Sequence, residues 1–166
     1  MNDVVVDSNV PIVANDRDGD YAPGCAIRCI ERLATVRDKE RVVLDFDDAI
    51  LAEYKNRLRS CGQPGPGDAF LNHILRHLGD GVRTRLVALT KHVDRLYDDF
   101  PVDESLLKFD KSDRKFVAAA IVTSAPVLNA VDSDWLDHEE SLSKCGVTVE
   151  FVCDRSASQH RKKKSK

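Results

Sequence analysis

Short runs of β-branched and aliphatic residues alternate along this chain with longer segments in which apolar residues recur every three or four positions. Runs of the first kind are typical of strands that are buried on both faces of a sheet, and the longer spacing is typical of amphipathic helices. Regular alternation of the two predicts a parallel sheet whose strands are joined by crossover helices. We therefore expect the fold class to be α/β, a layered sandwich around a central, mostly parallel sheet.

These patterns predict the individual elements and the domain boundaries. The expected strands lie at residues 4–6, 41–46, 127–131 and 147–153. The expected helices lie at residues 25–36, 48–60 (with Asp47 or Asp48 as its cap), 68–78, 110–124 and 136–145. Residues 82–89 are ambiguous between strand and helix, and residues 95–100 are helical or a loop. We expect one domain at residues 1–154, followed by a basic disordered tail at residues 155–166.

The formal net charge of −3 conceals a division between the domain and the tail. Residues 155–166 contain six of the 25 Lys and Arg residues and no acid, so the domain holds 19 basic and 28 acidic residues. Such a tail is typical of a phosphate-binding arm, with Arg161, Lys162, Lys163 and Lys164 as candidate nucleic-acid contacts. A partner contact and a solubilising terminus of no further consequence are the alternatives.

The apolar residues and the cysteines indicate the compartment. No apolar stretch reaches the length of about 18 residues that a membrane-spanning helix requires, and the N-terminus has no basic start, so we expect neither a membrane span nor a secretory signal. The five cysteines form no CxxC pair, which favours free thiols in a reducing cytoplasm. Cys25 and Cys29 share a helix face, where we expect two small buried apolar side chains.

Acids follow two of the expected strands directly. Asp7 ends the VVV run, Asp132 ends the run at 127–131, and Asp134 comes two residues later. Ligands of open α/β sheets bind beyond the carboxyl ends of the strands, so these carboxylates converge at one edge if the two strands are neighbours. Carboxylates brought together in this way repel one another unless a cation neutralises them.

Two helices offer further acids. Glu53 lies at the border of the apolar stripe of its helix, and Asp113 shares a face with Val117 and Ile121, which points it toward the sheet. Each acid taken alone also fits a turn residue, a first-turn acid favoured by the helix dipole or a solvated side chain. Together, four acids without a catalytic His or Cys favour a hard cation, Mg²⁺ or Mn²⁺, as the cofactor.

The order of these motifs resembles the PIN domain family of metal-dependent nucleases. The resemblance covers nearly all of residues 3–153 and rests on VVVDSN, AILAEYKNRL, SDRKFVAAAI and VLNAVDSDWL, in that order. It implies a three-layer α/β/α sandwich in which Asp7, Glu53, Asp113 and Asp132 are the catalytic metal ligands. Asn9 matches a family position and would orient Asp7 or a water. The chain departs from the family at Ala130, where a Ser or Thr is common, and this leaves Asp134 as an alternative or additional ligand.

The same resemblance implies an activity and partners. The expected activity is Mg²⁺- or Mn²⁺-dependent endoribonucleolytic cleavage that leaves 5′-phosphate and 3′-hydroxyl ends. A toxin–antitoxin or defence role follows as a hypothesis, with RNA as substrate, a cognate antitoxin or inhibitor as partner, a homodimer as a further hypothesis and no membrane association. The Gly/Pro-rich segment 61–104 is longer than in the smallest family members and is a hypothetical site of substrate or partner contacts.

Two other functions remain open from the residues alone. One is a catalytically silent PIN-like fold that is kept as a binding module. The other is an aspartate-nucleophile phosphatase of the haloacid-dehalogenase-like type, with Asp7 as nucleophile and Lys111 or Lys115 as its lysine. That second function is weakened because Asn9 replaces the acid that would act as general acid and base.

Overall fold

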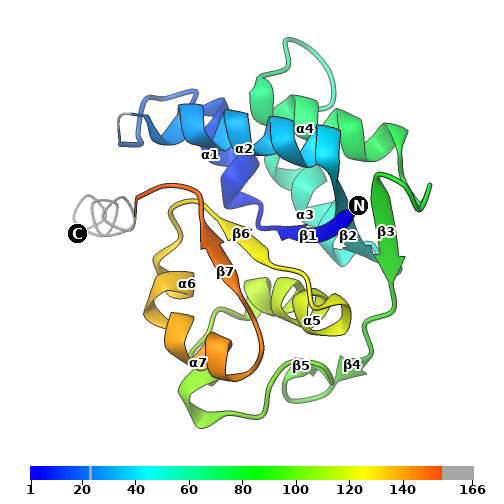
Figure 1. Ribbon diagram of the computed structural model, residues 1–166, viewed down its shortest axis with the longest axis vertical. Coiled ribbons are helices and arrows are strands. Elements are labelled where there is room, and N and C mark those ends of the chain that lie inside the picture. Colours follow the sequence, from blue (N-terminus) through cyan, green and yellow to red (C-terminus); the bar gives the residue numbers. More distant parts are fainter. Residues whose placement is uncertain (23, 155–166) are drawn as a thin grey trace.

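The computed structural model describes residues 1–22 and 24–154, which form an α/β sandwich around a five-stranded sheet (Figure 1). All the strand pairings of this sheet are parallel, and the strand order is β3-β2-β1-β6-β7. Its strands are β1 (Asn2–Val6), β2 (Glu40–Asp45), β3 (Thr84–Val87), β6 (Val127–Asn129) and β7 (Val149–Phe151). The predicted fold class is confirmed.

Helices cover both faces of this sheet. The helices α1 (Asn9–Asn15), α2 (Cys25–Lys39) and α4 (Pro66–Arg76) pack together on one face (Figure 1). On the other face lie α5 (Arg114–Thr123), α6 (Ser133–Asp137) and α7 (Glu139–Lys144), while α3 (Ala49–Arg57) contacts both β2 and α5. The result is a three-layer arrangement with the sheet in the middle.

The first strand lies at the centre of the core. Val4, Val5 and Val6 are completely buried, and β1 pairs with β2 on one side and with β6 on the other. A strand in this position contacts helices on both faces, which is why it is apolar at every position instead of alternating. The prediction of a doubly buried first strand is therefore confirmed.

Several predicted boundaries were wrong. The short helix α1 was not predicted, because it has only seven residues and contains Pro11, which is tolerated in a first helical turn. The helix expected at 136–145 is two helices, α6 and α7. Residues 95–100 contain a strand, β5 (Leu96–Tyr97), which pairs antiparallel with β4 (Lys91–His92). Short 3₁₀ helices, η1 (Glu104–Leu106) and η2 (Lys111–Asp113), precede α5.

Part of the segment 61–104 belongs to the core architecture. It supplies α4 to one helical layer and β3 to the edge of the sheet. Gly67 of α4 lies so close to α1 that a Cβ atom there would be 1.8 Å from the carbonyl oxygen of Pro11. The Gly/Pro composition of this segment therefore reflects close helix packing in part, because only glycine permits such an approach.

Of the two expected caps, Asp48 occupies the N-cap position of α3, but among the described residues its side chain makes no capping hydrogen bond. The side-chain cap comes from Asp45. The two carboxylate oxygens of Asp45 accept hydrogen bonds from the amides of Ala49 and Ile50, each at 2.9 Å. We expect Asp45→Ala to lower the free energy of unfolding by about 1–2 kcal/mol, because two helical amides lose their acceptor. Urea denaturation measures this loss, and the exposed neighbour provides the control, since Asp47→Ala should change stability by less than about 0.5 kcal/mol. Equal losses in both variants would contradict the assignment.

The expectation that all five cysteines are free was wrong. Cys25 and Cys153 form a disulfide, while Cys29, Cys61 and Cys145 are free. The two bonded residues are 128 positions apart, and only the packing of α2 beside the end of β7 brings them together. Sequence spacing alone carries no information about such a pair.

Among the described residues, no helix combines the length and the apolar character needed to cross a bilayer. The expected tail at residues 155–166, with Arg161, Lys162, Lys163 and Lys164, lies outside the residues that the structure describes.

Candidate metal centre

The candidate site lies where the chain reverses its direction of travel across the sheet. From β1 the chain moves to β2 and β3 on one side, and then returns to β6 and β7 on the other side. The carboxyl ends of the adjacent strands β1 and β6 therefore flank the topological switch point, which is the usual ligand site of open α/β sheets. Asp7 directly follows β1, and Asp132 lies three residues after β6.

Three carboxylates from three distant segments converge at this point. One carboxylate oxygen from each of Asp7, Asp113 and Asp132 lies within 4.8 Å of the other two. Asp7 and Asp113 are only 2% and 5% exposed, and Asp132 is half-buried. Asp113 occupies the N-cap position of α5, yet among the residues that the structure describes its carboxylate makes no capping hydrogen bond. The convergence expected from the strand ends is therefore present, and the local structure of α5 does not account for Asp113.

Burial and mutual repulsion disfavour ionisation of these acids. Burial raises the pKa of Asp7 to about 7, and the charges of Asp132 and Glu53 act in the same direction. Burial also raises the pKa of Asp113 to about 10, with the charges of Asp7 and Asp132 as the next causes. Such acids hold protons near neutral pH unless a cation replaces them, and this arrangement is common at functional sites.

Glu53 faces the same group of acids but is already paired. Its carboxylate accepts a hydrogen bond from the Ser8 hydroxyl at 2.5 Å and forms an ion pair with the Lys115 ammonium. Lys115 is mostly buried, and its ammonium also donates to the carbonyl oxygen of Ser112. Glu53 thus contributes negative charge near Asp7 and Asp113 without belonging to the group of three converging carboxylates.

Asp134 lies outside the group of three as well. Its Oδ2 accepts a hydrogen bond from the Asp110 amide at 2.7 Å, and its Oδ1 lies 3.3 Å from Nδ1 of His138. Asp132 instead uses one oxygen to cap α6 through the Asp134 amide, at 3.0 Å. Of the two acids that the sequence left open as the last ligand, Asp132 is the one that the fold brings to Asp7 and Asp113.

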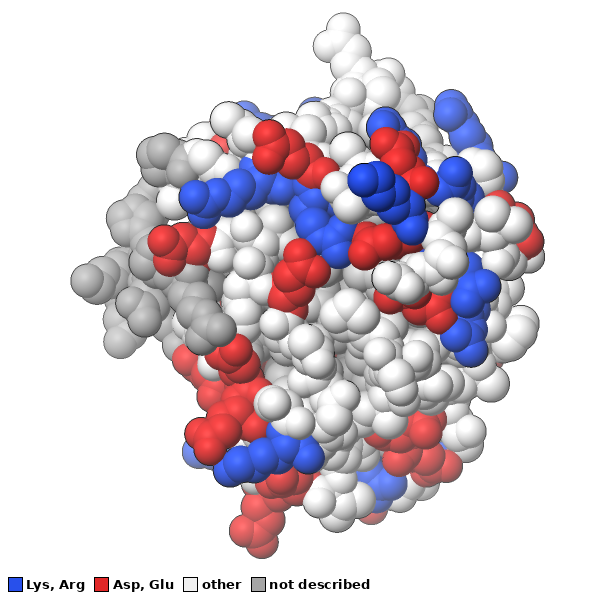
Figure 2. Space-filling model, viewed as in Figure 1, with Lys and Arg blue, Asp and Glu red and all other residues white. Residues whose placement is uncertain are grey.

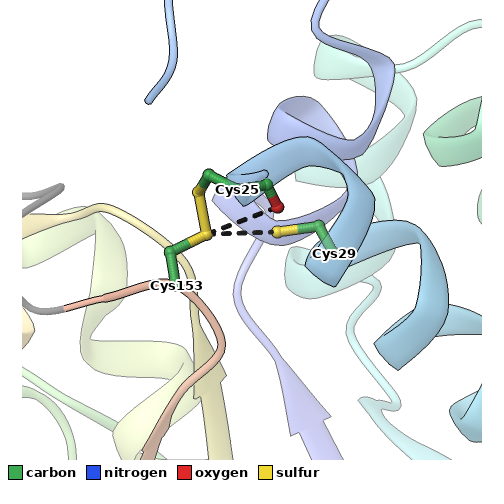
Figure 3. A group of neighbouring side chains, drawn as sticks. All are labelled: Cys25, Cys29 and Cys153. Atoms are coloured by element: carbon green, nitrogen blue, oxygen red, sulfur yellow. Dashed lines mark hydrogen bonds between the residues drawn. A yellow bond between two sulfur atoms is a disulfide. The ribbon is translucent and has the colours of Figure 1, made fainter. Parts of the chain in front are cut away.

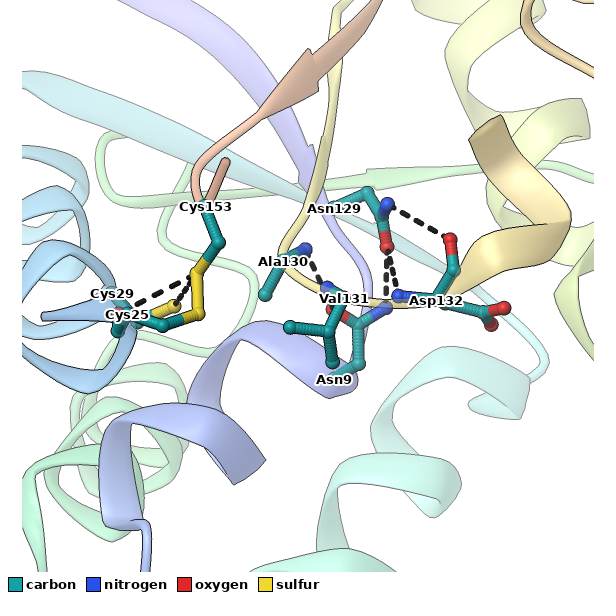
Figure 4. Close-up of a disulfide and its surroundings, with 8 residues drawn as sticks. All are labelled: Asn9, Cys25, Cys29, Asn129, Ala130, Val131, Asp132 and Cys153. Atoms are coloured by element: carbon teal, nitrogen blue, oxygen red, sulfur yellow. Dashed lines mark hydrogen bonds between the residues drawn. A yellow bond between two sulfur atoms is a disulfide. The ribbon is translucent and has the colours of Figure 1, made fainter. Parts of the chain in front are cut away.

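Asn9 acts on the acids through two different groups. Its backbone amide donates to Oδ1 of Asp7 at 3.0 Å, which agrees with the expected orienting role. Its side chain, however, is directed at the segment after β6 (Figure 4), where Oδ1 accepts from the Ala130 amide at 2.7 Å and Nδ2 donates to Oδ1 of Asn129 at 2.8 Å. The side-chain amide of Asn9 therefore holds the segment that leads to Asp132.

Asn129 and Trp135 are supporting residues that the sequence analysis missed. The Asn129 side chain bonds both the amide and the carbonyl group of Asp132, at 3.2 and 3.1 Å (Figure 4). The indole nitrogen of Trp135, a completely buried residue, donates to Oδ2 of Asp7 at 2.5 Å. Asn129 stands three residues before Asp132 and Trp135 three residues after it, but nothing in that spacing reveals the long-range bond to Asp7.

The donor set fits a hard divalent cation. All the converging donors are carboxylate oxygens, which Mg²⁺ and Mn²⁺ prefer, and Mg²⁺ is usually held by a few carboxylates together with waters and substrate phosphates. The residues that could hold such an ion are Asp7, Asp113 and Asp132, with Glu53 beside them. A bound cation would offset the repulsion that raises the pKa values of Asp7 and Asp113.

The charges on the surface give little indication of a nucleic-acid interface. On the face that Figure 2 shows, Lys and Arg side chains alternate with Asp and Glu over the upper half, and the middle is largely uncharged. The described residues therefore form no continuous basic surface on this face.

Comparison of the chain with protein-family models, with curated proteins and with solved structures found no match.

Proposed function

We propose that this protein is a Mg²⁺- or Mn²⁺-dependent endoribonuclease that hydrolyses RNA phosphodiester bonds. The observation that carries the proposal is the convergence of Asp7, Asp113 and Asp132 at the topological switch point, with two of the three carboxylates almost completely buried. Grouping acids there disfavours their ionised forms, so the arrangement is useful where a cation neutralises them. The resemblance of the motifs to the PIN domain family supports RNA as the substrate class.

The residues of the site divide into those that hold the ion and those that position them. Asp7, Asp113 and Asp132 would hold it, and a bound Mg²⁺ or Mn²⁺ would supply a Lewis acid that polarises a phosphodiester and activates a water. Trp135 and the Asn9 amide fix the two oxygens of Asp7. Lys115 and Ser8 fix Glu53, which leaves that carboxylate beside the ion site with its charge partly compensated.

The biological setting of this activity is part of the same proposal. Uncontrolled RNA cleavage is toxic to a cell, which favours a toxin–antitoxin or defence role with a cognate inhibitor as partner. The homodimer stays a prediction.

Cleavage of RNA by the purified full-length protein tests the proposal. We expect cleavage with Mn²⁺ or Mg²⁺, none with EDTA, and a loss of at least about 100-fold in Asp7→Asn, because disturbing even the outer shell of a metal site costs 10–100-fold. Asp18→Asn is the matched control, because it makes the same chemical change at an exposed acid. Equal cleavage by the wild type and Asp7→Asn would refute the proposal.

The ion pair between Lys115 and Glu53 favours a second candidate, a catalytically silent binding module. A cation fixed on one of the expected ligands lowers the charge that is available for a metal. Calorimetric titration with Mn²⁺ distinguishes the two functions, since the silent module predicts no binding that depends on Asp7, Asp113 or Asp132. The phosphatase hypothesis is less favoured, because both oxygens of Asp7 accept hydrogen bonds and Lys115 pairs with Glu53.

A further inference from the structure

Three cysteine sulfur atoms meet beside the carboxyl end of β7 (Figure 3). Cys25, the first residue of α2, is bonded to Cys153, and Sγ of Cys29 lies 3.7 Å from Sγ of Cys153. All three residues are at most 3% exposed. Because a bonded sulfur carries no proton, the Cys29 thiol is the donor in its contact with Cys153.

The disulfide attaches a weakly held strand to the helical layer. The strand β7 has three residues, lies at the edge of the sheet and, within the described part of the chain, pairs only with β6. None of its residues is fully buried. Cys153 lies two residues beyond this strand, so its bond to α2 fixes the end of β7 independently of the sheet. A short edge strand without such a bond is expected to open locally at low free-energy cost.

A short chain of contacts leads from this strand to the segment that carries Asp132. The amide of Val152 donates to the carbonyl oxygen of Asn129 at 2.8 Å. The side chain of Asn129 in turn bonds the backbone of Asp132 (Figure 4). The neighbouring residues of the same segment, Ala130 and Val131, donate their amides to Asn9. Asn129 therefore connects the two parts: its side chain holds the backbone of Asp132, and its carbonyl oxygen is bonded to Val152, next to the disulfide residue Cys153.

We propose that Cys25 and Cys153 form a reversible thiol–disulfide site, and that reducing it loosens the end of β7 and, through Asn129, the segment that carries Asp132. The reductant is a dithiol, which gives up two electrons and two protons. Its first thiolate attacks one sulfur of the disulfide and releases the other cysteine, and its second thiolate closes its own disulfide and releases the remaining one. The products are two protein thiols and one oxidised dithiol.

While the site is buried, Cys29 does not act in place of the external dithiol to attack the disulfide. Burial raises the pKa of the Cys29 thiol to about 12, so this residue stays protonated, and the thiolate is the form that attacks a disulfide. In the reducing compartment that the sequence leads us to expect, disulfides are mostly transient and redox-sensing, which fits a bond that an outside dithiol opens and the oxidised form of that dithiol closes.

A metal site is the competing interpretation of the same three sulfur atoms. Within the described part of the chain, this group offers three ligands, whereas a closed structural zinc site has four, and two of the sulfur atoms are bonded to each other. We therefore favour the redox site and make zinc binding an outcome of the experiment.

The first test uses the full-length protein, oxidised or treated with a dithiol. Peptide mapping without reductant should identify the Cys25–Cys153 linkage. Reduction should lower the melting temperature by roughly 10 °C, because a cross-link that closes a loop of this length strongly restricts the unfolded chain. It should also speed hydrogen exchange about tenfold or more at Val152 and at residues 130–134. With or without the dithiol, Cys153→Ser should resemble the reduced wild type. Cys61→Ser, at an exposed free cysteine, should respond to the dithiol as the wild type does.

The second test measures metal affinity in the two redox states, and only this part rests on the proposed function. We expect reduction to weaken Mn²⁺ binding about fivefold or more. Any of three results would overturn the proposal: no Cys25–Cys153 linkage in the peptide map, unchanged hydrogen exchange at residues 130–134 after reduction, or stoichiometric Zn²⁺ bound by the three thiols. If neither redox state binds Mn²⁺, the proposed nuclease site fails, while exchange at 130–134 still decides on the redox site.

Discussion

Asp113→Asn is expected to raise the melting temperature of the metal-free protein and, at the same time, to abolish metal-dependent RNA cleavage. The Asp113 carboxylate is almost completely buried beside Asp7 and Asp132, and burial together with their charges raises its pKa to about 10. Folding at neutral pH must therefore either protonate this group or bury its charge. An amide has nearly the same shape and carries no charge, so the substitution removes this cost.

The size of the effect follows from the same pKa. Each unit of pKa change corresponds to about 1.4 kcal/mol, and relaxation around the site reduces the full amount, so we expect a gain of roughly 1–3 kcal/mol at pH 8. For a chain of this length each kcal/mol raises the melting temperature by about 2–4 °C. Cleavage should fall by at least about 100-fold, because the amide does not replace an anionic ligand.

Differential scanning fluorimetry and RNA cleavage measure the two effects on the same preparations. Asp18→Asn, at an exposed position, should change neither the melting temperature nor the cleavage rate. A lower melting temperature in Asp113→Asn would show that this carboxylate stabilises the fold, and that result would contradict the interpretation of the site as a functional compromise.

The stability of the metal-free protein is expected to fall as the pH rises from about 5 to about 9. Asp7 and Asp113 have pKa values of about 7 and about 10 in the folded chain, above the ordinary value of 3.8 that they regain on unfolding. Between the ordinary pKa and the folded pKa values, the folded state binds more protons than the unfolded state, so raising the pH favours unfolding. The contribution of the two groups is complete below the ordinary pKa and is lost as the pH passes through the folded pKa values.

A divalent cation should reverse this trend. Mg²⁺ competes with the protons on Asp7 and Asp113, so its stabilising effect should be small at pH 5 and should increase toward pH 9. Urea denaturation at a series of pH values, with EDTA or with Mg²⁺, measures both curves. The variant Asp7→Asn/Asp113→Asn is the control and should show neither the fall nor the response to Mg²⁺. A wild-type curve that rises with pH in EDTA would contradict the assignment.

Below about pH 4 we expect stability to decrease again as the pH is lowered, because other acids act in the opposite direction there. Backbone amides hold the pKa of Asp80 down at about 2, and the guanidinium groups of Arg41 and Arg85 lower the pKa of Asp3. Stability from such groups is present above the ordinary pKa and is lost as the pH falls through the folded value. The expected profile therefore has a maximum near pH 5.

The parts of the fold that could be predicted are those with local causes. The VVV run of β1 is buried on both faces, and a continuous apolar run predicts that environment without knowledge of any neighbour. Asp7 directly follows β1 and Asp132 lies three residues after β6, so their place at the carboxyl edge of a parallel sheet could be inferred as soon as the sheet was expected. Asp113 opens α5 on the face that turns inward, which helical periodicity indicates.

Partnerships across long separations could not be predicted. Glu53 and Asp113 look equivalent as helix acids, yet Lys115 and Ser8 hold Glu53, and the described residues give Asp113 no capping bond. Asp132 and Asp134 are two residues apart, and only the turn after β6 directs one toward Asp7 and the other toward Asp110. These differences depend on side-chain directions that the packing of several elements sets.

The sequence by itself determined the α/β class, the buried first strand and the acids that meet at one edge of the sheet, because periodicity and chain order express these properties locally. The tertiary structure alone decided that Trp135 bonds Asp7 and that Cys25 pairs with Cys153. The physical reason is the distance along the chain. Trp135 is 128 residues from Asp7 and Cys153 is 128 residues from Cys25, and no periodicity of the sequence extends over such a separation.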